Sequence, residues 1–257
     1  MFERFVGILG FLVARSASPR KAAIIACGFA ACLFTQTAVA ETLEGGVAAY
    51  KGGDYRTALK ILRPLALQGN IVAQHNLGIM YENGLGVPQD FAEAVKLYRL
   101  VAERGIQSAQ FNLGNMYRRG LGVPQDFAEA AKWYRLAADQ GDAYAQSNLG
   151  LMYKNGQGVI MDYAETVRLF RLSANQGNPA GQFNLAIMFA RGDGGPKDIV
   201  QAHMWLSLAV KGYGTSNTKG RDEAMDILNI ITKYMDVAQI AEAERLVHEW
   251  LAAHPTK

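Results

Sequence analysis

Apolar and polar positions alternate with helical spacing over most of the chain, and the same pattern returns every 36 residues. The copies begin AQHNLGIMYENGLGVPQD at Ala73, AQFNLGNMYRRGLGVPQD at Ala109 and AQSNLGLMYKNGQGVIMD at Ala145, and a degenerating copy begins GQFNLAIMFARGDGGPKD at Gly181. An incomplete copy, Gly53 to Asn70, precedes the first. A fixed period of this length is typical of proteins built from stacked helical repeats.

Each copy predicts two helices. In the first copy we expect a helix over residues 73–83, because apolar residues recur there at helical spacing before the glycine pair Gly84 and Gly86. Asp90 then begins the second helix as its N-cap, and Glu93, three residues on, predicts a capping box. The same Asp and Glu pair returns in the next two copies, so the prediction extends to them.

Glycines and aromatic residues recur inside these helices. A mid-helix glycine costs about 1 kcal/mol relative to alanine, and close packing between helices is the expected compensation. The aromatic residues form ladders that an isolated helical hairpin could not bury, so we predict that the hairpins stack into an all-α superhelix. The glycines are Gly78, Gly114 and Gly150; the aromatic positions are Tyr81, Tyr117, Tyr153 and Phe189, with Tyr98, Tyr134 and Phe170.

The pattern A-x-x-x-L-G-x-x-Y-x-x-G-x-G-V-P-x-D resembles the Sel-one-like repeat, a relative of the tetratricopeptide repeat, from Ala73 to about Gly212. The resemblance implies a right-handed superhelical solenoid that binds other proteins as a scaffold, adaptor or regulator, with no catalysis and no cofactor. Proteins that resemble it are linked to signalling control, envelope assembly and exopolysaccharide regulation. The third copy departs from the pattern at Ile160, where a proline is usual, and the fourth departs at Ala186, where a glycine is usual.

The ends of the array predict the domain organisation. We expect an N-terminal partial repeat over residues 41–72, the repeats over 73–212, and a linker with capping helices over 213–257. The last second helix is expected over residues 199–210 and is short for the family. The capping helices are expected over residues 221–235 and 237–252, the second one opened by Asp236 with Gln239 in the capping-box position.

The N-terminus predicts export. A basic cluster ending at Lys21 precedes an apolar stretch and the small-residue site Ala38-Val39-Ala40, which is the pattern of a cleaved secretory signal. We therefore expect residues 1–40 to be removed between Ala40 and Glu41, leaving a periplasmic protein with no stable membrane insertion. Both cysteines lie within the signal, so the mature chain is expected to hold no disulfide.

The composition and charge of the chain indicate which class of partner it binds. Half of the residues are hydrophobic and 19% are charged, which predicts a folded core. The first forty residues hold four basic side chains and one acidic side chain, so the remaining 22 basic and 22 acidic residues balance to zero. A neutral body disfavours nucleic-acid binding, which needs a clustered positive surface. We expect the partner to be another protein or peptide, such as an envelope signalling or assembly component.

The first helices supply a candidate partner-binding stripe. By analogy with tetratricopeptide arrays these helices line the concave side, and one face of them carries residues that differ from copy to copy, mixing apolar anchors with charges suited to a peptide. The alternative is that these side chains pack against neighbouring second helices, and the sequence leaves both open. The stripe comprises His75, Ile79, Glu82, Phe111, Asn115, Arg118, Ser147, Leu151, Lys154, Phe183 and Ile187, with Ala190 at its end.

An asparagine follows the first stripe position in every copy: Asn76, Asn112, Asn148 and Asn184. These side chains could clamp a peptide backbone. They could also form hydrogen bonds between adjacent repeats, which is the role that we favour.

The sequence gives little support for a catalytic function. The four histidines lie in different elements without metal-ligand spacing, and the G-x-G segments follow helices and not strands, so we predict neither a metal site nor a nucleotide site. Ser216 to Lys219 matches S-x-x-K, and some cysteine-rich relatives of the family are described as β-lactamases. A cell-wall or β-lactam hydrolase is therefore the alternative function, although the accompanying motifs are missing.

Overall fold

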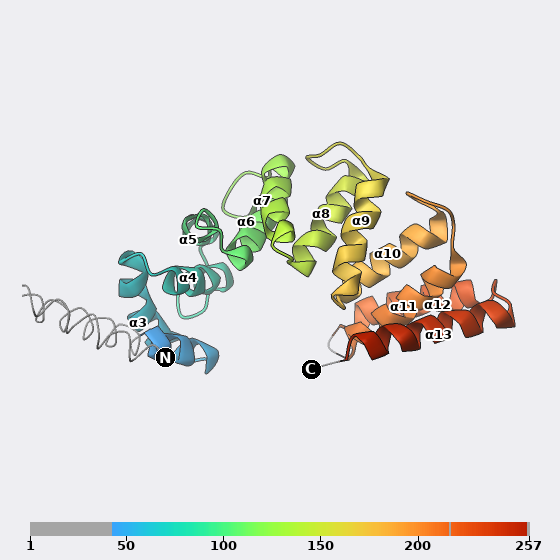
Figure 1. The fold of residues 1–257 in the computed structure, drawn as a ribbon. Helices are drawn as coiled ribbons and strands as arrows, with labels where there is room; N and C mark the ends of the chain where they lie inside the picture. The colour runs from blue at the N-terminus through green and yellow to red at the C-terminus, as the bar shows by residue number, and fades with distance from the viewer. Residues whose placement is uncertain (1–42, 216, 256–257) are drawn as a thin grey trace, which may run out of the picture. The chain divides into compact units, whose positions relative to one another are not determined.

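The computed structural model describes residues 43–215 and 217–255, and within them all regular structure is helical (Figure 1). The predicted signal segment, with Ala40 and Glu41, lies outside the described residues. The described residues divide into two compact units, one up to residue 77 and the other from residue 78 on, and α4 (Ile71–Asn83) runs through the boundary. The expected all-α class is confirmed.

The first unit pairs a helix over residues 43–51 with α3 (Tyr55–Leu67). Gly53, with φ of 79°, turns the chain between them, and the Asp54 side chain caps α3 by accepting from the Thr57 amide at 3.1 Å. Leu62 is fully buried in this unit. The two helices form a hairpin at the place of the predicted partial repeat, which stays a prediction.

The second unit is a solenoid of successive helical hairpins, in which each helix from α5 to α11 packs on the next along the chain (Figure 1). The first helices α6, α8 and α10 begin 36 residues apart, at Gln107, Ala143 and Pro179, as the sequence period predicts. The helices are α5 (Phe91–Ala102), α6 (Gln107–Arg119), α7 (Phe127–Asp139), α8 (Ala143–Asn155), α9 (Tyr163–Asn175), α10 (Pro179–Arg191), α11 (Ile199–Tyr213), α12 (Thr218–Thr232) and α13 (Val237–Ala253).

Aspartate caps open the second helices, and this part of the capping prediction is confirmed. The Asp90 carboxylate accepts from the Glu93 amide at 3.0 Å, and the same contact returns at α7 and α9. The reciprocal half of the predicted box was wrong. The Glu93 carboxylate turns away to pair with Lys96 at 2.9 Å, because a basic residue one turn along offers it a charged partner.

Mid-helix glycines allow the two helices of a hairpin to approach closely. A Cβ on Gly114 would lie 2.8 Å from the Tyr134 ring, and a Cβ on Gly150 would lie 2.7 Å from the Phe170 ring. Both rings are fully buried. The predicted reason for these glycines is therefore confirmed: each leaves room for an aromatic side chain of its own hairpin.

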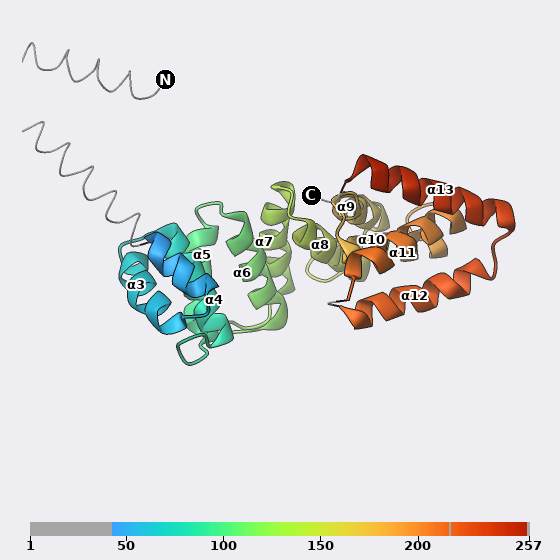
Figure 2. The same cartoon turned by 90° about the horizontal axis from the view of Figure 1, so that it is seen from below.

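Two helices close the C-terminal end. Figure 2 shows α12 and α13 on either side of α11, and both pack against it. The full capping box of Asp236 with Gln239 at the start of α13 is confirmed. Several predicted bounds were wrong, including the end of the first capping helix, which lies at Thr232 and not at residue 235. The helix α11 continues to Tyr213, the linker is correspondingly shorter, and α12 begins at Thr218 because Asn217 caps it through the Gly220 amide at 3.1 Å.

Candidate protein-binding surface

The stripe predicted on the first helices is a half-buried surface. Its members lie on α4, α6, α8 and α10 as expected, and all of them are partly exposed except Ser147, which is 3% exposed. Half-burial agrees with both predicted roles, packing and binding. The contacts of single residues distinguish the members that are held by the fold from those that are free to meet a partner.

Three polar members of the first two repeats, Glu82, Asn115 and Arg118, are hydrogen-bonded to a buried tyrosine of their own hairpin. The Tyr98 hydroxyl donates to the Glu82 carboxylate at 2.6 Å. The Tyr134 hydroxyl donates to Asn115 Oδ1 at 2.7 Å and accepts from Arg118 Nε at 3.1 Å. Burial raises the pKa of Tyr134, although Arg118 opposes the shift. These side chains are therefore oriented by the fold.

The third repeat lacks this tie because Phe170 stands at the tyrosine position. Phe170 is fully buried and has no hydroxyl to offer to the stripe. Lys154, at the position of Glu82 and Arg118, makes no hydrogen bond or ion pair with any residue that the structure describes. Its ammonium group is the stripe charge that remains available to an acidic partner.

The apolar members pack on their neighbours. The Phe111 ring lies 5.9 Å from the Tyr134 ring and 6.2 Å from the Tyr144 ring of the next repeat, measured between centroids. Leu151 and Phe183 rest against the buried cluster of the last repeats. These three residues support the fold with one side while the other side stays open to solvent.

The recurrent asparagines divide between two arrangements. Asn76 Nδ2 donates to the Val72 carbonyl at 2.8 Å, within its own helix. Asn148 lies near the Tyr134 hydroxyl of the preceding repeat and lowers its pKa. The inter-repeat hydrogen bond that we favoured and the clamp on a peptide backbone both stay predictions.

An arginine series joins successive repeats on another face, and our sequence reasoning missed it. Arg99 donates to the Tyr117 hydroxyl and Arg135 to the Tyr153 hydroxyl, each at 2.5 Å. Arg171 lies over the Phe189 ring at 5.9 Å from its centroid. The signal was present, since arginine and an aromatic residue each recur at the 36-residue period, but the period alone does not say that they meet.

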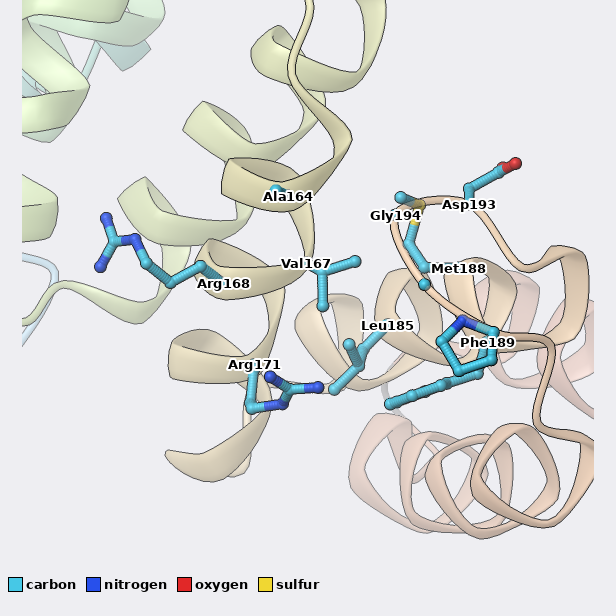
Figure 3. A pocket seen from close by; sticks show the side chains of 11 residues that line it. Ala164, Val167, Arg168, Arg171, Leu185, Met188, Phe189, Asp193 and Gly194 are labelled. Atoms are coloured by element: carbon cyan, nitrogen blue, oxygen red, sulfur yellow. The ribbon is translucent and has the colours of Figure 1, made fainter.

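A pocket of about 290 Å³ lies where this series ends, between α9, α10 and the loop after α10. Figure 3 shows the apolar side chains gathered at its centre, with Arg171 beside them and the ends of Arg168 and Asp193 pointing away. Gly195 stands where the earlier copies carry valine, which leaves this space unfilled. The apolar residues are Val167, Leu185, Met188 and Phe189. The pocket can accept one apolar side chain next to a guanidinium group.

Groups for catalysis do not converge in the described part of the chain. Within it, no three His, Cys, Asp or Glu side chains are placed to hold a metal ion. Burial lowers the pKa of both His75 and His203, so both are neutral side chains at pH 7. Of the S-x-x-K segment, Ser216 lies outside the described residues and Lys219 is an exposed residue of α12.

A membrane-spanning helix is likewise absent from residues 43–215 and 217–255, where none of the helices is both long and apolar enough.

The family model of the Sel1 repeat matches residues 71–106, 107–142, 143–178 and 179–212. Sel1 repeats generally serve as protein-interaction scaffolds. Among curated proteins, none matches the chain.

Solved structures of this repeat type are similar to the chain. A Sel1 repeat protein from Oxalobacter formigenes is 25% identical with a TM-score of 0.63, and the match covers 83% of this chain and 98% of that one. A Sel1 repeat protein from Klebsiella pneumoniae is 22% identical with a TM-score of 0.46, covering 76% and 93%. A protective antigen of uropathogenic Escherichia coli with an SLR fold is 22% identical with a TM-score of 0.35, covering 82% and 68%.

Proposed function

We propose that this chain, which belongs to the Sel1 repeat family, is a non-catalytic scaffold or adaptor that holds another protein in the periplasm or cell envelope. The stripe on the first helices is the binding surface. The observation that carries this proposal is that the stripe residues vary from copy to copy while a buried leucine between them stays the same. His, Phe, Ser and Phe occupy the first stripe position in successive copies, while the buried leucine two residues on never changes.

Partner contact through the stripe is expected to depend on Lys154. This ammonium group is half-buried and unpaired among the described residues, so reversing its charge removes attraction to an acidic partner without breaking a contact of the fold. We expect Lys154→Glu to weaken capture of the partner at least tenfold while the melting temperature stays within about 1 °C, as usual for a surface change. Capture is measured with immobilised protein and an envelope extract.

Lys233→Glu is the matched control, because Lys233 is an exposed lysine outside the repeats. Equal capture by the Lys154→Glu and Lys233→Glu proteins would contradict the stripe as the binding surface. A photoreactive residue at Ile187 should also crosslink the captured partner, and one at the exposed Leu136 of α7 should not. Crosslinks of equal yield from both positions would lead to the same rejection.

Export is the second part of the proposal and has its own test. N-terminal sequencing of protein purified from the envelope should return Glu41, because the small residues before it suit the signal peptidase. A chain that retains Met1 in a soluble cytoplasmic fraction would contradict the periplasmic location while leaving the scaffold proposal intact.

A further inference from the structure

A buried glutamine stands near the start of the first helix in each repeat, and its amide orientation is fixed. Gln110 Nε2 donates to the Ala102 carbonyl at 3.2 Å, and Gln146 Nε2 donates in the same way to Ala138 at 3.2 Å. Gln182 repeats the contact with the Ala174 carbonyl at 3.3 Å. Since the nitrogen must face that carbonyl, the Oε1 atom of each glutamine faces the other way.

In the middle of the array, a second glutamine satisfies that oxygen. Gln140 Nε2 donates to Gln110 Oε1 at 2.7 Å, and Gln176 Nε2 donates to Gln146 Oε1 at 2.8 Å. Each donor comes 30 residues after its acceptor, from the end of the following second helix. A side-chain carboxamide therefore completes the contact in both the second and the third repeat.

The donor glutamine is missing at both ends of the array. In the first repeat, Gln74 donates to the Ala66 carbonyl at 3.1 Å, but its Oε1 has no partner among the described residues, and position 104 is an arginine. The last repeat differs in that a pocket lies beside its glutamine. The residue 30 positions after Gln182 is Gly212, which has no side chain. Gln182 is 2% exposed, and its Oε1 accepts from no residue that the structure describes. A Cβ on Gly212 would lie 3.6 Å from this oxygen and 2.9 Å from Cγ of Pro179, so a side chain that entered the space beside the oxygen would have to displace the Pro179 ring. Leaving a buried acceptor unpaired costs about 1–3 kcal/mol.

That space is part of a pocket of about 480 Å³ at the ends of α9, α11 and α13. Leu208 and the ring of Trp250 supply apolar walls, the buried Trp250 N–H has no acceptor among the described residues, and Gln182 and Gly212 both line the pocket. Lys211, exposed on α11, adds a positive charge. The volume lies in the range of about 300–1,000 Å³ that is typical of ligand pockets.

We propose that this pocket binds the carboxamide of an asparagine or glutamine side chain presented by a partner. The unpaired oxygen of Gln182 requires a hydrogen-bond donor. The Lys211 ammonium disfavours a cationic donor, and a carboxylate has no hydrogen to give. Neutral carboxamides and hydroxyls can both donate, and a carboxamide is the group that fills this position in the second and third repeats. The partner replaces the glutamine that Gly212 omits.

The test titrates N-acetyl-L-glutamine methylamide into the ¹⁵N-labelled full chain and follows the indole N–H resonances of its three tryptophans. We expect a saturable shift of the Trp250 resonance and none of Trp133, which lies outside the pocket. The matched glutamate compound, with a carboxylate in place of the carboxamide, should bind at least tenfold more weakly. A shift that does not saturate, or equal binding of the two compounds, would overturn the proposal.

Two variants act on the site by different routes. Gln182→Met keeps the shape of the side chain but removes the acceptor. Gly212→Gln supplies the missing carboxamide from within the chain, and it is made together with Pro179→Ala because its Cβ would otherwise lie 2.9 Å from Pro179 Cγ. Each should abolish the Trp250 shift. Gln146 already accepts a hydrogen bond from Gln176, so Gln146→Met should leave the Trp250 shift unchanged. Persistent binding in the Gln182→Met protein, or equal loss in the Gln146→Met protein, would show that the shift does not report the Gln182 oxygen.

Discussion

The third repeat differs from the fourth. In the third, Gln176 completes the contact of Gln146, and Tyr153 accepts from Arg135 of the repeat before it. In the fourth, the matching positions hold Gly212 and Phe189, so the Gln182 oxygen has no partner among the described residues, and Arg171 lies over an aromatic ring that has no hydroxyl. The same arrangement of helices is closely packed where the glutamine and the tyrosine are present. It leaves a pocket where glycine and phenylalanine replace them.

The C-terminal helices replace the apolar contacts of a further repeat but not its polar ones. Ala224 and Ile231 of α12 join Trp205 and Leu206 of α11 in one buried cluster, and Leu251 of α13 packs against it. No carboxamide reaches Gln182 from these helices. The end of the array is therefore sealed against water by hydrophobic packing and left open to a ligand that carries hydrogen-bond donors.

The largest expected effect on stability comes from removing the two C-terminal helices, α12 and α13. Deleting residues 218–257 re-exposes large side chains such as Trp205 and Leu206, and each of them costs about 1.5–3 kcal/mol when exposed. We expect the unfolding free energy to fall by about 5 kcal/mol or more, with aggregation visible by size-exclusion chromatography. A chain that ends at Pro255 is the control. A monomeric truncated protein with an unchanged urea midpoint would contradict the capping role.

A smaller effect on stability tests why the residues packed at the centre of each hairpin differ between the middle repeats and the fourth repeat. The middle repeats pair a glycine with an aromatic ring, as in Gly150 with Phe170, whereas the fourth pairs Ala186 with Leu206. We expect Gly150→Ala to cost about 1–3 kcal/mol by overpacking, and Phe170→Leu to relieve part of that cost in the double variant. Urea unfolding of the four proteins gives the coupling energy. Additive losses would show that the two positions are independent.

The exposed Gly45 is the control for helix propensity. A Cβ there would meet no atom within 4 Å, so Gly45→Ala should stabilise its helix by about 0.5–1 kcal/mol. Stabilisation by both alanine substitutions would contradict the packing explanation for Gly150.

Much of this fold could be predicted from the sequence because its determinants are local. The helix caps at Asp90 and Asp236 and the mid-helix Gly114 follow from short-range patterns, and the 36-residue period fixes their order. The glutamine contacts could not be predicted in this way. Gln176 meets Gln146 across 30 residues, and only the register between helices decides that pairing.

The candidate stripe was predicted only in part for a similar reason. Helical spacing places Phe111 and Lys154 on one face, but it does not reveal that Tyr144 of the next repeat covers the Phe111 ring. Nor does it show that Tyr134 holds Arg118 while Phe170 leaves Lys154 without such a tie. Which member of a stripe is free depends on its neighbours in adjacent helices, and the sequence of one helix does not specify them.

The arginine series provides a still smaller test of the same comparison. Tyr153→Phe removes the hydroxyl that accepts from Arg135, and we expect a loss of about 0.5–1 kcal/mol, at the low end for hydrogen bonds because Arg135 is exposed. Phe189→Tyr introduces a hydroxyl near Arg171 and should return a gain of no more than that size. Thermal unfolding measures both. Equal stability of all three proteins would mean that the bond contributes nothing, as exposed polar contacts sometimes do.

The smallest expected effect is a pH dependence that belongs to the C-terminal end. His203 of α11 is 8% exposed, and burial lowers its pKa below the usual 6.5 while Glu244 opposes the shift. The unfolded chain therefore takes up the proton first, so stability is fully present above pH 6.5 and is lost as the pH falls through the folded pKa. The loss stays below about 1 kcal/mol at pH 6.

Urea unfolding at pH 7, 6 and 5.5 should show a shallower decline for His203→Gln than for wild type. The decline should not vanish, because His75 is shifted in the same direction. His248→Gln, at an exposed position on α13, is the control and should follow wild type. Identical declines for the His203→Gln and His248→Gln proteins would mean that the His203 imidazole is hydrated in the folded chain and that the junction tolerates its charge.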